Sequence, residues 1–111
     1  NTPLQALTMM NDGVFVEAAQ ALALRAMREG HHRLETLFRL VLNRKPRAEE
    51  LSRLQDFHAE QKARVKKSGL AALQMLGSHQ KAISPPQAAE AATLVAVARI
   101  LMNLDEFINR E

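Results

Sequence analysis

Four histidines and one arginine within an apolar segment are the side chains of this 111-residue sequence that could do chemistry. A zinc site on a helix needs imidazoles one turn apart, because the metal requires converging ligands. His31 and His32 are adjacent in the sequence, so we expect them to point apart. The absence of Cys excludes disulfides, thiolate zinc sites and iron–sulfur clusters. The sequence therefore predicts no metal site and no cofactor in this chain.

His58 is the histidine that we expect nearest the core. It follows Leu51 and Leu54 on the same helical face and precedes Val65. A catalytic base needs a nucleophile or a pair of carboxylates beside it, and the spacing of residues supplies neither. We predict a partly buried imidazole that is hydrogen-bonded to a neighbour.

Arg99 is the single charge in the middle of the most apolar segment, residues 88–102. A buried guanidinium must be paired, because an uncompensated buried charge costs several kcal/mol. Asp105, Glu106 and Glu90 are the carboxylates that could pair with it. We predict a structural clamp formed by Arg99 with Asp105 and Glu106, and the alternative is that Arg99 binds an anion or a substrate.

Basic residues are concentrated in the middle of the chain. Residues 25–67 contain twelve Lys or Arg against six Asp or Glu, although the net charge of the chain is only +3. A break at residues 44–47 between two predicted helices superficially resembles a helix-turn-helix, and clustered cations could neutralise phosphates. Interleaved acidic residues and the absence of Tyr and Trp favour a solvated face and make nucleic acid an unfavoured partner. The polyanion-binding alternative would use Arg39, Arg44, Lys45, Arg47, Lys62, Arg64, Lys66 and Lys67.

Helical periodicity and capping residues predict five or six helices, and no strand pattern is present. Gly30 should end one helix, and Arg44-Lys45-Pro46 another, because the residue before a proline is disfavoured in a helix. The predicted helices are a short one after Thr2-Pro3, one from Asp12 to about Glu29, one over 34–42, one from about Ala48, one over 70–76 and one over 88–102.

The segment 88–102 is apolar on nearly every side, which is typical of a helix around which others pack. It is shorter than the roughly 20 residues that a bilayer crossing requires. We predict a compact all-α bundle over residues 1–111, as a single domain with this helix at its centre and 34–42 packed against it. We expect no pocket lined by reactive side chains.

Motifs at both ends of the chain are similar to those of a known family. Residues 1–8 (NTPLQALT), continuing to Ala19, and residues 98–108 (ARILMNLDEFI) resemble the C-terminal segment of the planctomycete cytochrome-associated domain of unknown function, the PSD-one domain or domain of unknown function 1553. Residues 38–46 (FRLVLNRKP) resemble its middle helix pair. Gly13 departs from the family, which more often has Pro there. The resemblance implies a large exported parent protein, with c-type haem in a separate upstream domain. It supplies no catalytic residues.

The chain begins at Asn1 rather than Met, so we expect it to be the C-terminal fragment of a larger protein. We expect a non-catalytic helical module that packs against or docks other domains of an exported or cell-envelope protein, or that self-associates. One alternative is a polyanion-binding module that uses the basic middle helices. Another is the helical part of an enzyme whose site is completed by upstream domains.

Overall fold

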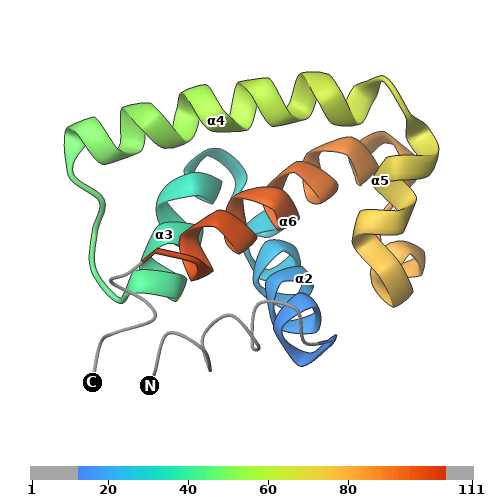
Figure 1. Cartoon of the computed structure of the whole chain (residues 1–111), viewed down its shortest axis with the longest axis horizontal. Coiled ribbons are helices and arrows are strands. Elements are labelled where there is room, and N and C mark those ends of the chain that lie inside the picture. The colour runs from blue at the N-terminus through green and yellow to red at the C-terminus, as the bar shows by residue number, and fades with distance from the viewer. Residues whose placement is uncertain (1–12, 105–111) are drawn as a thin grey trace.

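The structure, a computed structural model, describes residues 13–104. These residues form helices and no strand, so the all-α prediction is confirmed (Figure 1). The helix predicted after Thr2-Pro3 lies outside the described residues. The α-helices are α2 (Gly13–Met27), α3 (Arg33–Leu42), α4 (Ala48–Lys66), α5 (Gly69–Leu76) and α6 (Ala88–Met102), and the short 3₁₀ helices are η1 (Gly30–His32), η2 (Gly77–Ala82) and η3 (Pro85–Gln87).

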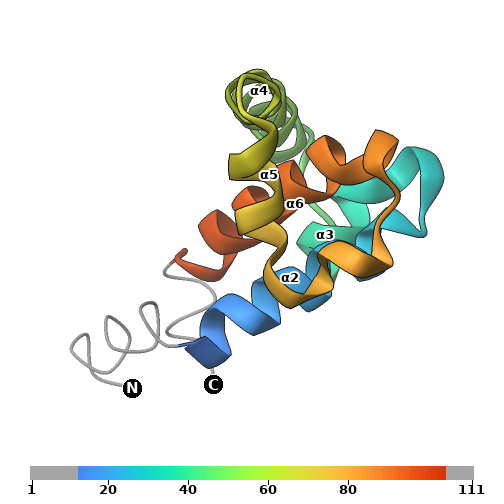
Figure 2. The ribbon, with the colours of Figure 1, turned by 90° about the vertical axis from the view of Figure 1, so that its right-hand side faces the viewer.

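Helix α6 occupies the centre of the bundle, as the sequence predicts. Figures 1 and 2 both show α4 along one side of α6 and α2 along the opposite side. Helices α3 and α5 also pack against it. Most of its residues are buried: Ala91, Ala92, Thr93, Leu94, Val95, Val97, Ala98, Leu101 and Met102. Alanine at several of these positions lets the neighbouring helices approach closely.

The junction between α3 and α4 follows from local chemistry. Asn43 adopts the left-handed conformation (φ 62°), and its backbone N–H donates to the Arg39 carbonyl, which ends α3. Pro46 prevents continuation of the helix. The Glu50 carboxylate then accepts from the backbone N–H of Arg47 at 2.8 Å, which satisfies a donor at the start of α4. Helix α4 therefore begins at Ala48, as predicted.

Helix α4 has a small apolar attachment to the bundle. Leu54 and Val65 are its buried residues, and Phe57 is partly buried against the core. His58 adds a polar contact with α6. Among residues 13–104, no helix combines the length and the apolarity needed to cross a bilayer.

Candidate functional site

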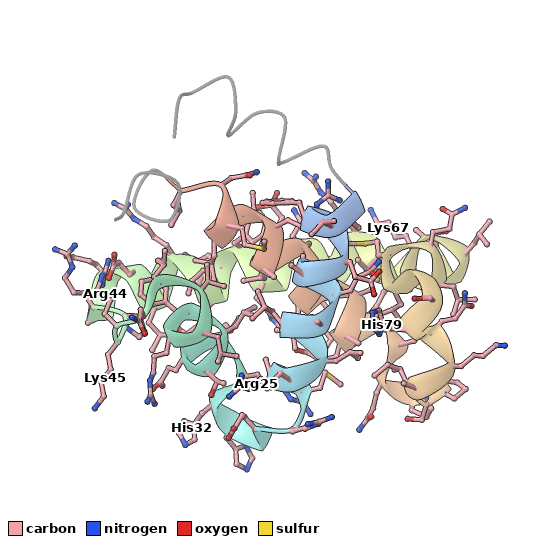
Figure 3. The ribbon with its side chains drawn as sticks, turned by 90° about the horizontal axis from the view of Figure 1, so that it is seen from below. Arg25, His32, Arg44, Lys45, Lys67 and His79 are labelled. Atoms are coloured by element: carbon pink, nitrogen blue, oxygen red, sulfur yellow. The ribbon has the colours of Figure 1, made fainter. Side chains whose placement is uncertain are left out.

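A groove of about 590 Å³ lies beside α3, between the end of α2 and the segment that follows α3. Its lining is predominantly basic. Figure 3 shows Arg25 on the side of α3 that faces α2, and Arg44 and Lys45 on the other side. Four cations and one carboxylate are among the residues that line this open groove, which favours an anionic ligand. The lining residues are Arg25, Glu29, Thr36, Arg39, Leu40, Asn43, Arg44 and Lys45.

Arg44 forms a rigid wall of this groove. Its two terminal nitrogens donate to the two carboxylate oxygens of Glu50 at 2.9 and 2.8 Å, and its guanidinium lies 4.9 Å from the centre of the Phe38 ring. The hydrogen bond from Arg44, followed by that from the Arg47 backbone, lowers the pKa of Glu50 to about 2. Glu50 thus remains ionised at neutral pH and holds the guanidinium in place.

The structure divides the predicted polyanion-binding residues between distant places. Three of them, Arg39, Arg44 and Lys45, line the groove. Helix α4 has 19 residues and spans about 28 Å, which carries the last predicted cations away from this end. Arg47 pairs with Glu50 at 3.4 Å, Arg64 with Glu60 at 3.1 Å and Lys62 with Glu90 at 3.0 Å, while Lys66 and Lys67 lie at the far end of α4.

Arg25 is a groove cation that the sequence analysis did not predict. It is an exposed residue in the last turn of α2, where a cation ordinarily complements the helix dipole. Only the packing of α2 against α3 brings it beside Arg39. No spacing in the sequence could have indicated this neighbour.

His58 joins α4 to α6, and the prediction of a partly buried, hydrogen-bonded imidazole is confirmed. Its Nε2 lies 2.8 Å from Oε2 of Glu90, and the Nζ of Lys62 lies 3.0 Å from Oε1 of the same carboxylate. The side chains of His58 and Glu90 are 20% and 14% exposed. The hydrogen bond from His58 lowers the pKa of Glu90 to about 2, with a further contribution from Lys62 and against the effect of burial. An ionised carboxylate can only accept, so Nε2 carries the proton.

A second hollow, of about 230 Å³, adjoins this ion pair, and it contradicts the expectation that no pocket is lined by reactive side chains. Its lining residues include His31, His32, Arg33 and His58. The short helix η1 contributes both His31 and His32 to this lining. That their imidazoles point apart stays a prediction. Within residues 13–104, no three His, Asp or Glu side chains are grouped as metal ligands.

Arg99 is exposed, so the prediction that it is buried is wrong. The apolar helix α6 retains a narrow solvent-facing strip in its second half, where Arg99 and Ile100 lie. Arg99 borders a recess of about 260 Å³ between α2, α5 and α6. Glu90, one of its proposed partners, pairs with His58 and Lys62 instead. Asp105 and Glu106 lie outside the described residues, so the clamp that involves them stays a prediction.

Residues 1–58 match the protein family described as PSD1, Protein of unknown function (DUF1553). The chain belongs to this family. No curated protein and no solved structure shows significant similarity to the chain. The PSD1 match includes α2, α3 and the part of α4 that carries His58, whereas Glu90 and the motif at 98–108 lie beyond it. The basic groove therefore lies wholly within the part that matches PSD1.

Proposed function

We propose that this PSD1 chain is a non-catalytic docking module of a larger exported protein, and that its groove beside α3 holds an acidic segment of another domain of that protein. One observation carries the proposal. Arg25, Arg39 and Lys45 face the same groove, and none of their side chains forms an ion pair with another of the residues 13–104. Their charges are available to a partner.

The arrangement of the groove suits a peptide rather than an extended polyanion. The unpaired cations come from α2, α3 and the segment after α3, and they surround one open depression. A polyanion such as nucleic acid needs a continuous track of cations along its length. Acidic partners interrupt such a track on α4, where Arg64 pairs with Glu60 and Lys62 with Glu90. Charge complementarity at one concave site would orient an acidic segment on the module.

One observation favours a second candidate, the helical part of an enzyme completed by another domain. The hollow beside His58 has an imidazole oriented by a carboxylate, which is the arrangement of many general bases. The other domain would have to supply a nucleophile or a substrate site. We prefer the docking proposal because residues of this chain alone make the groove cationic. The enzyme candidate would need catalytic or substrate-binding groups from another domain.

A matched pair of variants tests the docking proposal. Arg39→Gln/Lys45→Gln removes two positive charges from the groove, whereas the control Lys66→Gln/Lys67→Gln removes two from the far end of α4. The probe is a hexaglutamate peptide, and its affinity for the full chain is measured by NMR titration at low salt. We expect the groove variant to bind about tenfold more weakly, which corresponds to ~1.4 kcal/mol, and the control to bind as the unchanged chain does.

The same titration with heparin and duplex DNA separates the alternatives. Equal losses in the two double variants would show a diffuse charge effect and overturn the docking site. Tighter binding of heparin or DNA than of the peptide, with a steep salt dependence, would replace docking by polyanion binding. The proposal would also be overturned if the unchanged chain did not bind hexaglutamate at low salt.

A further inference from the structure

We propose that the hollow between η1, α4 and α6 is a second ligand site, which binds a small oxyanion, a carboxylate or phosphate group, through Arg33, His31 and His32. This site shares no lining residue with the groove beside α3. Its volume of about 230 Å³ suits a small molecule or a single anionic group rather than a peptide.

Arg33 provides the observation that points to a ligand. Its Nε is buried, and among residues 13–104 no acceptor is within hydrogen-bond distance of it. Leaving a donor of a charged group buried and unpaired is costly, and such groups in folded proteins nearly always have a partner. The planar guanidinium presents Nε and a terminal nitrogen side by side, which matches the two oxygens of a carboxylate or phosphate.

The carboxylates around the hollow do not neutralise the positive charge of Arg33. Glu90 of α6 is already compensated by His58 and Lys62 of α4. Glu35 of α3 is 48% exposed and lies 3.8 Å from the Nδ1 of His32, so water screens its charge. Arg33 is therefore the charge at this site that lacks close compensation.

His31 and His32 of η1 also line the hollow, and both residues are exposed. A ring N–H of each imidazole can donate a hydrogen bond to an oxyanion that lies beside Arg33. The other ionisable residues that line the hollow are Arg33 and Glu35 of α3, His58 of α4 and Glu90 of α6.

The Nε–Hε signal of Arg33 reports directly on this site in an NMR titration. The probes are inorganic phosphate and acetate, each compared with sodium chloride at equal ionic strength. At one fixed neutral pH, we expect a saturable shift of the Arg33 signal with phosphate and no comparable shift with sodium chloride. A response to acetate as well would assign the site to carboxylates and phosphates alike, whereas a response to phosphate alone would restrict it to phosphates.

Two substitutions separate a bound ligand from a general charge effect. Arg33→Lys keeps the positive charge and removes Nε, so it should abolish saturable binding, while the control Arg53→Lys on the exposed face of α4 should retain it. If Arg33→Lys fails to fold, His31→Ala/His32→Ala, which removes both imidazoles from the hollow, should weaken phosphate binding by about threefold or more. Arg39→Gln/Lys45→Gln should leave phosphate binding unchanged, so failure of the docking proposal is distinguishable from failure of this one.

Three results would overturn the proposal. The first is an Arg33 signal that responds no more to phosphate than to chloride. The second is retention of phosphate binding by Arg33→Lys. The third is phosphate binding that is unchanged in His31→Ala/His32→Ala, which would show that the imidazoles of His31 and His32 take no part.

Discussion

The side-chain amide of Gln20 lies against Gly77, where an added Cβ would force the amide to move. A Cβ on Gly77 would lie 2.8 Å from Nε2 of Gln20. The same Nε2 donates to the carbonyl of Met75 at 3.0 Å, so this buried amide connects α2 to the end of α5. Gly77 also has a positive φ of 57°, which side chains rarely adopt.

This contact predicts a graded effect of alanine at three glycines. Gly77→Ala adds both a collision and backbone strain, and should lower the free energy of unfolding by about 2 kcal/mol or more. Gly30→Ala adds strain alone, since nothing lies within 4 Å, and should cost about 1 kcal/mol. Gly69→Ala at the start of α5 should be neutral or stabilising. Urea unfolding measures all three, and equal costs at Gly77 and Gly30 would refute the contact with Gln20.

The ion pair between α4 and α6 predicts how stability depends on pH. The pKa of Glu90 falls from its ordinary 4.5 to about 2 in the folded chain. The folded state therefore holds the proton less tightly than the unfolded state, so this stabilisation is present above about pH 4.5 and is lost as the pH falls towards 2. Its size is at most roughly 3 kcal/mol. The pKa of Glu50, at the start of α4, is also lowered, so stability changes with pH in the same direction there.

Glu90→Gln should remove this contribution, lower stability at neutral pH and flatten the decline between about pH 4.5 and 2. The control is Glu60→Gln, which breaks an exposed pair on α4 and should change stability by less than about 1 kcal/mol. Denaturant unfolding at a series of pH values measures both. An unchanged decline in Glu90→Gln would show that Glu90 does not have the lowered pKa.

Burial in α6 predicts the cost of truncating its side chains. Leu94 is fully buried, and Leu94→Ala should destabilise the chain by about 2–5 kcal/mol, because it removes apolar contacts and leaves a cavity. Ile100 lies on the same helix and is 43% exposed, so Ile100→Ala should cost less than about 1.5 kcal/mol. Thermal unfolding of the two variants measures both losses of stability. Similar losses in both variants would mean that the solvent-facing strip of α6 is covered.

Exposure of Arg99 predicts that Arg99→Ala has a small effect on stability. A guanidinium on the surface contributes about 0–1 kcal/mol through ion pairs, so the melting temperature should shift by only a few degrees. A loss of more than about 2 kcal/mol would instead support the clamp with Asp105 and Glu106.

The sequence was sufficient to predict where the helices lie, because hydrophobic spacing and helix-ending residues act over only a few neighbouring positions. The spacing of Leu37, Phe38 and Val41 marks one face of α3, and Pro46 and Gly30 interrupt the backbone whatever surrounds them. The near-continuous apolar character of α6 also predicted that the other helices pack around it.

The candidate sites depended on tertiary structure because their residues come from different helices. Periodicity placed His58 near the core, yet only the packing of α4 on α6 identified Glu90 as its partner, 32 residues away. Arg99 is exposed because the helices packed around α6 leave that position uncovered, which composition alone could not show.

Local propensity and the hydrophobic pattern thus determined which segments of this chain are helical and which helix is central, since both depend on neighbours within a few turns. The docking of those helices decided which charges remain unpaired. It brought Arg25 beside Arg39 and buried the Nε of Arg33, because charge pairing depends on distances in space that the order of residues does not specify.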